Sequence, residues 1–361
     1  MLFRSIMQLM TIAIPALEEM QKDGEDGRKK IAKITRYVTV VLGLIESAGM
    51  TIGFSRSGAL GPEHTNFTIV TMIIALTAGA ILVMWLGERI TENGVGNGIS
   101  IVLLFNIISS LPSDASTLYT RFMSGKSVAV SAVAAIIIVA IVIAIVVFVV
   151  VLQDGERRIP VQYSKKMQGR KMVGGQSSNI PLKVNTAGVI PVIFASSIMS
   201  FPVVIAQFFG SRINYDSIGG HILLMLNSSN WFKPERPVYS IGMVIYIALI
   251  IVFAYFYTSI TFNPLEVANN MKKSGGFIPG IRPGKPTSDY LNSILNYVVF
   301  IGACGLTIVC IIPIMVSGLF NVSRLSFGGT SLIIIVSVVL ETIKAIESQM
   351  LVRYYKGFLN D

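Results

Sequence analysis

The segment Val128–Leu152 consists almost entirely of alanine, isoleucine and valine, and it is long enough to cross a lipid bilayer as one helix. A membrane-spanning helix needs about 20 consecutive, mainly apolar residues, and this segment meets that requirement without a charge. The other architecture that spans membranes is a barrel, whose strands show about 10 residues of alternating polarity. Val128–Leu152 has no such alternation, so it predicts a transmembrane helix.

Similar apolar segments recur along the chain, which has 361 residues and is 53% hydrophobic. Charged residues make up 13% of the chain, against about 25% in a soluble globular protein. The pattern predicts an all-α, polytopic membrane protein with eight full spans. These spans are Tyr37–Phe54, Asn66–Leu86, Ile99–Leu111, Val128–Leu152, Thr186–Phe209, Val238–Thr261, Tyr290–Val316 and Thr330–Val352.

Three further segments complete this topology. Ile6–Leu17 is apolar but too short to cross a hydrocarbon core of about 30 Å. No small-residue cleavage site follows it, so we interpret it as a partial span and not as a signal sequence. The Gly- and Asn-rich segment Glu88–Gly98 predicts a tight loop between two spans, and Gly210–Pro237 predicts a longer polar loop.

The basic residues are unevenly distributed. The chain has 29 Lys and Arg residues, 19 Asp and Glu residues and a net charge of +10. Most of the Lys and Arg residues fall in loops on one side of the predicted spans, and the loop Gln153–Asn185 holds the largest group. The positive-inside rule places this side in the cytoplasm. Because the charge is confined to alternate loops, it does not indicate a general nucleic-acid-binding surface, although these loops also suit a partner that carries RNA.

The sequence has no motif for phosphate binding, zinc-dependent proteolysis or a nucleophilic serine. His64 and His221 lie in different loops and do not form a metal site. Cys304 and Cys310 lie six residues apart in an apolar segment, and we interpret them as small core residues. We therefore predict no enzymatic activity, catalytic residue, metal or cofactor.

A few ionisable residues fall inside the predicted spans. Glu46 lies in the first full span, whereas Glu341, Lys344 and Glu347 share one face of the last. Such residues can mark an ion relay, so a small-molecule secondary transporter is an alternative function. An ion pair between Glu341 and Lys344, with Glu347 at the membrane interface, is the simpler interpretation.

The second long polar loop, Phe262–Asp289, contains the sequence IPGIRPG. Its Pro and Gly content excludes one continuous helix. Phe277, Ile278 and Ile281 indicate an ordered segment, and we predict a hairpin-like finger with a rigid tip that carries Arg282. Docking of a large cytosolic partner explains these residues, whereas a solvated loop that only sets topology explains the lysines alone.

Several motifs together resemble one family. They are ITRY (Ile34–Tyr37), MWLGERITENGVGNGIS (Met84–Ser100), ERRIPVQY (Glu156–Tyr163), SSNIPLKVNTAGVIPVIFASS (Ser177–Ser197), TFNPLEVANNMKKSGGFIPGIRPG (Thr261–Gly284), GGTSLIIIV (Gly328–Val336) and YKGFL (Tyr355–Leu359). The chain resembles the SecY family, the central subunits of the bacterial Sec protein-translocation channel. The resemblance covers nearly the whole chain.

The resemblance implies a two-halved helical channel of ten helices around an hourglass pore. On that template, residues 1–152 run from the end of the second helix to the sixth, which formally begins the second half. Residues 153–186 are a cytoplasmic loop, and residues 187–361 are the C-terminal half, helices seven to ten, with the cytoplasmic loop 262–289. The family's first helix and plug have no counterpart here, so we expect an N-terminally truncated form; a truncated, non-conducting fragment is a second alternative function.

The resemblance also implies functional residues. Aliphatic side chains of a pore ring match Ile99, Val102, Ile193 and Ile334. Polar residues that could hydrogen-bond across a lateral gate are Asn185, Thr186, Ser196 and Ser197. Basic residues expected to dock the ATPase SecA or a ribosome are Arg157, Arg158, Lys165, Lys166, Arg282 and Lys285.

The resemblance implies a function and partners for the whole chain. It implies a protein-conducting channel subunit for secretion and membrane-protein insertion, located as a multi-pass protein in the bacterial cytoplasmic membrane. The implied partners are SecE, SecG, SecA, the ribosome, secretory preproteins with signal sequences, and membrane lipids.

Overall fold

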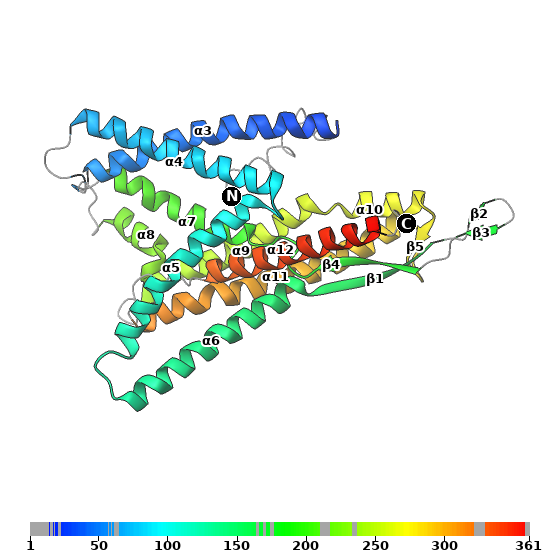
Figure 1. The fold of residues 1–361 in the computed structure, drawn as a ribbon. Coiled ribbons are helices and arrows are strands. Elements are labelled where there is room, and N and C mark those ends of the chain that lie inside the picture. Colours follow the sequence, from blue (N-terminus) through cyan, green and yellow to red (C-terminus); the bar gives the residue numbers. More distant parts are fainter. Residues whose placement is uncertain are drawn as a thin grey trace. The chain divides into compact units, whose positions relative to one another are not determined.

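The fold is that of a computed structural model (Figure 1). It describes residues 14, 17, 19–20, 23–56, 58, 60, 65–163, 166–168, 171–173, 177–209, 217–232, 237–320 and 329–357. Most of the predicted partial span, Ile6–Leu17, lies outside the described residues.

Long helices dominate the described chain, as the apolar segments predicted. The α-helices are α3 (Glu25–Arg56), α4 (Asn66–Asn93), α5 (Gly98–Phe122), α6 (Val128–Asp154), α7 (Ile190–Phe209), α8 (Ile218–Leu226), α9 (Ile241–Thr261), α10 (Pro264–Lys273), α11 (Lys285–Phe320) and α12 (Gly329–Gly357). Two short 3-10 helices, η2 (Ser228–Asn230) and η3 (Pro237–Ser240), lie between α8 and α9.

Six helices in the described part of the chain are long and apolar enough to cross a membrane. They are α3, α4, α5, α6, α9 and α11. Helix α7 is apolar over Ile190–Ala206 but shorter, and α12 is not among the six. A multi-pass helical membrane protein is therefore supported, whereas the number of eight full spans stays a prediction.

The chain is mostly but not purely helical, which corrects the all-α prediction. Strands β1 (Glu156–Tyr163), β4 (Ser177–Lys183) and β5 (Gly276–Phe277) form an antiparallel sheet in the order β4-β1-β5. Strands β2 (Lys166–Gln168) and β3 (Lys171–Val173) pair in a separate hairpin. All five strands lie in the two long polar loops, where short segments of mixed polarity replace the continuous apolar segments that form helices.

The predicted polar loop Gly210–Pro237 also contains regular structure that we did not predict. Helix α8 begins after Ser217, whose hydroxyl accepts a hydrogen bond from the Gly220 amide at 3.3 Å. The helix is apolar, and His221 is one of its few polar residues. An apolar stretch behind a capping serine favours a helix even within a loop.

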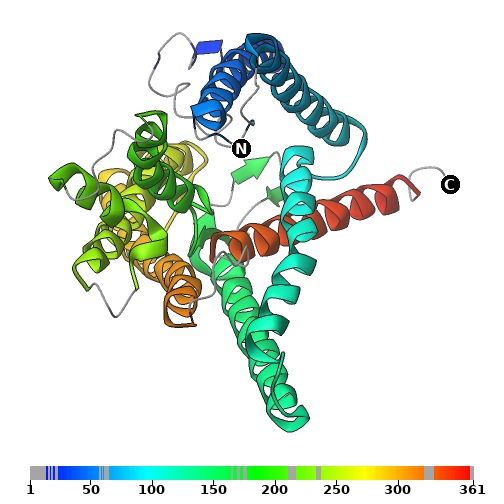
Figure 2. The same ribbon diagram turned by 90° about the vertical axis from the view of Figure 1, so that its left-hand side faces the viewer.

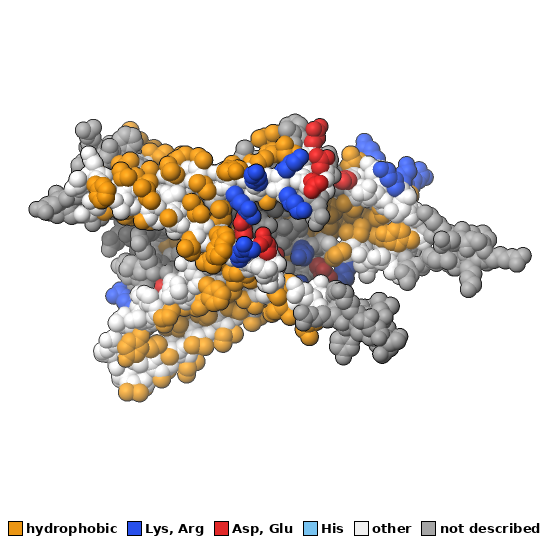
Figure 3. Space-filling view, turned by 45° about the horizontal axis from the view of Figure 1, so that its top comes forward, with side chains coloured by type: hydrophobic (Ala, Val, Ile, Leu, Met, Phe, Trp, Pro, Cys, Tyr) orange, Lys and Arg blue, Asp and Glu red, His pale blue; other side chains and the backbone are white. Residues whose placement is uncertain are grey.

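The long helices expose large apolar side chains, including Phe67, Val128 and Ile136. Figure 3 shows hydrophobic side chains over broad areas of one face, whereas Lys, Arg, Asp and Glu side chains gather in restricted patches. Monomeric soluble proteins rarely expose large contiguous apolar areas. In lipid these faces need no further cover, because each helix satisfies its own backbone hydrogen bonds.

Helices α3 and α4 lie side by side (Figure 2), and Arg36 Nε donates to Glu88 Oε1 at 2.7 Å between them. The turn from α4 to α5 is the tight loop that the glycines predicted. The Gly98 amide donates to Thr91 Oγ1 at 2.9 Å, and a Cβ on Gly98 would lie 2.0 Å from the Gly87 carbonyl oxygen. Glycine is therefore required where the two helices approach each other.

The chain divides into two compact units. One consists of Met1–Ser116, Ser197–Gly242 and Val338–Asp361, and the other of Thr117–Ser196 and Met243–Ser337. The predicted boundaries at residues 152 and 186 stay predictions.

Candidate functional site

The sheet joins the two long polar loops. Strand β1 pairs with β4 from Glu156 opposite Lys183 to Gln162 opposite Ser177. At its other edge, β1 pairs with β5, so that Gln162 lies opposite Phe277. We call β1, β4, α10, β5 and residues 278–284 the basic platform. Its strands come from loops that lie far apart in the sequence, and one sheet orders both.

Strand β1 has one buried and one exposed face along most of its length. Ile159 and Val161 are buried, whereas Arg158, Pro160 and Gln162 are exposed. This alternation is typical of an antiparallel sheet with one face on a core and the other in water. The exposed face leaves Arg158 available to a partner.

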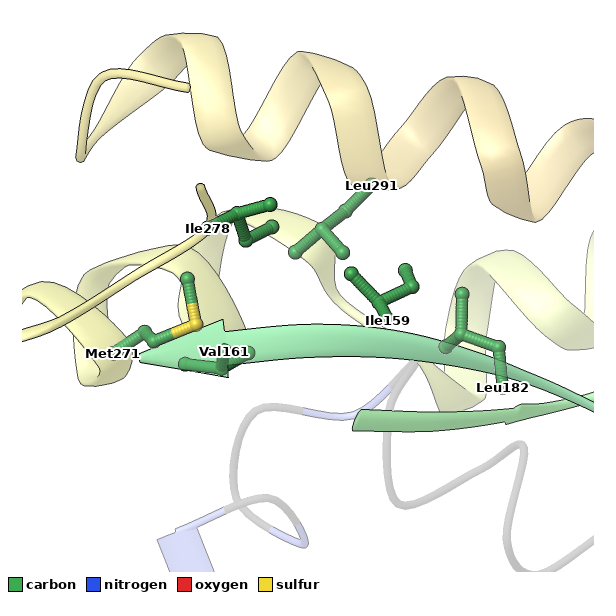
Figure 4. Close-up of a cluster of buried hydrophobic side chains, with 6 residues drawn as sticks. All are labelled: Ile159, Val161, Leu182, Met271, Ile278 and Leu291. Carbon is green, nitrogen blue, oxygen red and sulfur yellow. The ribbon is translucent and has the colours of Figure 1, made fainter. Parts of the chain in front are cut away.

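The buried face covers a small apolar core, shown in Figure 4. Its six buried side chains are Ile159, Val161, Leu182, Met271, Ile278 and Leu291. They come from β1, β4, α10, the segment after β5, and α11, and Ile281 packs against them. Burial of each such side chain contributes about 1.5–3 kcal/mol. The predicted ordering of the segment around Ile278 and Ile281 is therefore confirmed.

Helix α10 forms the first arm of the predicted finger and is capped at its start. Asn263 Oδ1 accepts hydrogen bonds from the amides of Leu265 and Glu266, at 3.1 and 3.3 Å, and Pro264 occupies the first turn. These are favoured choices at a helix N-terminus. Lysines in the last turn interact favourably with the helix dipole and place positive charge beside the tip.

The tip is held by its backbone. Gly280 and Gly284 have φ angles of 82° and 106°, which favour glycine. The hydroxyl of Thr287, a fully buried residue at the start of α11, donates to the carbonyl oxygen of Arg282 at 2.8 Å. The side chain of Arg282 is exposed. The structure thus presents an exposed Arg282 side chain on a hydrogen-bonded backbone, and its docking role stays a prediction.

The platform and the start of α11 carry a surplus of exposed basic side chains. These are Arg157, Arg158, Lys183, Lys272, Lys273, Arg282 and Lys285. Arg158 Nε donates to Glu156 Oε1 at 2.6 Å, and these side chains are 70% and 30% exposed. Such exposed pairs are weak, so they hold Arg158 only loosely. Lys165 lies outside the described residues, and Lys166 lies on β2, where its side chain is not described.

The platform rests directly on membrane helices. The Val184 amide donates to the Gly155 carbonyl at 2.8 Å, which extends the β1–β4 ladder to the end of α6. A Cβ on Gly302 of α11 would lie 2.2 Å from the Val184 carbonyl oxygen, and one on Gly305 would lie 2.5 Å from Leu152. The two glycines let the base of the sheet and the end of α6 lie against α11.

The predicted pore-ring residues fall in both compact units. Ile99 and Val102 lie in α5 of one unit, and Ile193 and Ile334 lie in α7 and α12 of the other. Each of the four is half-buried. The ring they would form together stays a prediction.

The predicted gate residues mostly bond locally. Thr186 Oγ1 donates to the Lys183 carbonyl at 2.7 Å, and Ser196 Oγ donates to the Ile193 carbonyl at 2.9 Å. Asn185 is buried in the turn before α7, and Ser197 belongs to the other unit. Hydroxyls in helices commonly make such local bonds and can exchange partners, so the gate also stays a prediction.

Sequence reasoning missed several residues that position the platform. It did not identify Leu182, Met271 and Leu291 as core, Thr287 as support for Arg282, or Gly302 as a contact point. The alternation in ERRIPVQY and SSNIPLK could have indicated two short strands. Nothing local indicates that β1 also pairs with β5. Among the described residues, no group of three or more His, Cys, Asp or Glu side chains could hold a metal ion.

Comparisons with known proteins agree on one family. The family model for SecY matches residues 4–343. The protein translocase subunit SecY of Streptomyces galbus is 44% identical, and the match covers 98% of this chain and 80% of that protein. The SecY subunits of Corynebacterium glutamicum and Mycobacterium tuberculosis H37Rv are 42% and 41% identical over the same shares.

Solved structures with a similar fold are channels for proteins. A structure described as that of a protein conducting channel matches with a TM-score of 0.59 and 18% identity, over 96% of this chain and 78% of that chain. Sec61 in a canine ribosome-channel complex from the endoplasmic reticulum matches with a TM-score of 0.57, 16% identity and the same coverage. At this identity the structures establish the fold.

Proposed function

From the premise that this chain belongs to the SecY family and is a protein-conducting channel subunit, we propose that the basic platform docks the cytosolic partner that drives transport. The channel has no reaction of its own to supply energy, so the driving force comes from a partner. The partners proposed are SecA and the ribosome, which would meet the same exposed surface. SecE and SecG are proposed as companion subunits in the bacterial cytoplasmic membrane.

The observation that carries this proposal is the rigid presentation of Arg282. A flexible arginine loses side-chain and backbone entropy when it binds, which weakens the complex. At the tip, the backbone is already ordered by the apolar core, by two glycines and by the Thr287 hydroxyl. Arg282 therefore needs only its side chain ordered on binding. A planar guanidinium can also bind a carboxylate or a phosphate through two hydrogen bonds, which suits an acidic protein surface or ribosomal RNA.

Arg157, Arg158 and Lys285 would contribute mainly to the rate and salt dependence of docking. Exposed charges steer a partner of opposite charge and are screened by salt. Lys165 and Lys166 are proposed for the same role from their position in the first loop.

We further propose that Ile99, Val102, Ile193 and Ile334 line one apolar constriction. All four are aliphatic and half-buried, which suits a surface that faces a narrow passage. A narrow apolar pore loses its water, so ions meet a desolvation barrier. Aliphatic side chains make no directional bonds and can yield to a passing polypeptide. Eight full spans, including α7 and α12, are part of this proposal.

The lateral gate is proposed at the start of α7. Polar contacts between helices in lipid contribute about 1 kcal/mol each, which suits a seam that must open for a signal sequence. Asn185, Thr186, Ser196 and Ser197 would exchange local bonds for bonds across that seam. Replacing Ser197 with alanine should change the stringency for signal sequences in a translocation assay; unchanged stringency would count against the gate role.

Charge reversal at the tip tests the docking proposal. Arg282→Glu should weaken SecA binding and slow SecA-driven export into inverted membrane vesicles at equal channel abundance. Arg282→Lys keeps the charge but loses the two-bond geometry, so its effect should be intermediate.

A matched control separates docking from a general effect of charge. Lys126 is an exposed basic residue in the predicted loop on the opposite side of the membrane. Lys126→Glu should leave SecA affinity unchanged. Wild-type export by Arg282→Glu, or an equal loss in both variants, would refute the docking role.

A further inference from the structure

A groove lies between α9 and α11, apart from the exposed tip that carries Arg282. It has a volume of about 310 Å³. Its apolar lining includes Phe256, Phe262, Leu295 and Val299, and its polar lining includes Tyr255, Thr258, Ser259, Asn292 and Asn296. All of these residues belong to one compact unit. The mixture of aromatic, aliphatic and amide groups is typical of a ligand site and not of a bare lipid-facing helix.

The predicted topology places the groove at a membrane–water boundary. Its α9 residues fall in the last two turns before Thr261, where the predicted span meets the cytoplasmic loop. Chain direction orders the lining by depth, since α9 runs outward to the loop and α11 runs back in. Leu295 and Val299 are therefore deeper, and Ser259 and Asn292 lie nearer the cytosol. Tyr255 lies at the inner end, and Phe262 and Pro264 lie at the outer end, so apolar and hydrogen-bonding groups occur along the whole groove. Such a mixed lining suits a phospholipid, whose acyl chains and headgroup would both contact it.

One buried side chain of the lining has an unsatisfied hydroxyl. Thr258 is only 2% exposed, and its Oγ1 has no hydrogen-bond partner among the described residues. Thr258 also lines the groove. A buried hydroxyl without a partner costs free energy, so an acceptor that enters the groove would be favoured. A phosphate or ester oxygen of a lipid is such an acceptor.

Two carboxylates near the outer end of the groove favour a headgroup with a positive charge. Asp289 shares a face of α11 with Asn292 and Asn296, because the three are spaced by three and four residues. Glu266 follows Pro264 in the first turn of α10. Both carboxylates are exposed, and no ion pair of either is found within the described part of the chain. Lys285 is one turn further out than Asp289 and is the nearest basic residue on that face of α11.

We propose that this groove is a selective site for a phospholipid whose headgroup ends in an ammonium, such as phosphatidylethanolamine. The acyl chains lie against Leu295 and Val299. The phosphate accepts from the Thr258 hydroxyl and from the side-chain amides of Asn292 and Asn296, whereas the Tyr255 and Ser259 hydroxyls already donate to the carbonyl oxygens of Asn296 and Phe256. The ammonium meets Asp289 and Glu266, which repel a headgroup of net negative charge.

Quenching of tryptophan fluorescence by brominated lipids tests this site in the full chain, reconstituted with its companion subunits. Phe256→Trp places the probe in the groove, and Val252→Trp places a matched probe one turn deeper on α9, outside the lining. The parent chain, with Trp85 and Trp231, supplies the background. Half-maximal quenching of the probe at 256 should need about one-fifth as much brominated phosphatidylethanolamine as brominated phosphatidylglycerol. This is the ratio expected when one unit-charge contact in water favours the first lipid. The two lipids should be equal at position 252.

Two further variants identify the groups responsible. Asp289→Asn with Glu266→Gln should remove the preference at position 256 and leave position 252 unchanged. Thr258→Val should weaken quenching by both lipids at position 256 alone. Equal quenching at both positions would mean ordinary boundary lipid and would overturn the proposal. Quenching at 252 but not at 256 would mean that a partner protein covers the groove, and would also overturn it.

Discussion

Replacing Thr287 with valine should loosen the tip of the basic platform without changing Arg282. The substitution keeps nearly the same shape, but it removes the hydroxyl that donates to the Arg282 carbonyl at 2.8 Å. Thr287 is fully buried, so water does not readily replace that donor. Loss of one partner of a buried hydrogen bond costs about 1–3 kcal/mol.

This free-energy cost can be measured as an increase in local opening of the tip. A cost of about 1–3 kcal/mol corresponds to about 5- to 150-fold more of the open state. Two tip amides report that opening, because Ile281 donates to Ile278 at 3.0 Å and Ser288 donates to Gly284 at 3.1 Å. Amide hydrogen exchange measured on a peptide that spans residues 278–288 should therefore speed up by a factor in this range.

Thr287→Ser is the matched control, since it keeps the hydroxyl and loses one methyl group. Its exchange should stay closer to that of the wild type, and its affinity for SecA should exceed that of Thr287→Val. Equal exchange in the valine variant and the wild type would refute the positioning role. Equal acceleration in the serine and valine variants would show that packing, and not the hydrogen bond, holds the tip.

Three other changes test the platform and the helices. Ile159→Ala leaves a cavity in the apolar core and should destabilise the platform by about 2–5 kcal/mol, which faster proteolysis within β1 would report. Gln162→Ala on the exposed face is the control and should change stability by about 0.5 kcal/mol or less. Gly302→Val should push the base of the sheet away from α11 and lower the melting temperature of the reconstituted chain. Gly53→Val is the control, because a Cβ there meets no neighbour within 4 Å. Equal melting temperatures in the two variants would contradict the close contact at Gly302. Arg36→Gln should lower the free energy of unfolding by about 1 kcal/mol or less, because the ion pair to Glu88 is exposed. A larger loss of stability at high salt than at low salt would show that the interaction is not electrostatic.

The resemblance in the sequence anticipated the family correctly, and the IPGIRPG motif anticipated an ordered tip that carries Arg282. The hydropathy also located the long helices, as for Val128–Leu152, which lies within α6. Helix α3, however, begins well before the predicted start at Tyr37, and α5 continues well beyond the predicted end at Leu111. It also missed a helix, since Gly210–Pro237 contains α8 and not only loop. The four strands in the first long loop, β1 to β4, were missed because each is short and carries charges among its apolar residues.

The membrane helices could be predicted from the sequence because their cause is local. In lipid a segment must satisfy its own backbone hydrogen bonds, so a long apolar stretch has one favourable structure whatever surrounds it. The basic platform depends instead on pairing between distant segments: β1 meets both β4 and β5, and Leu291 of α11 closes the core between them. No stretch of sequence contains those contacts, because each strand is stable only beside its partners, and only the tertiary structure decides which partners it meets.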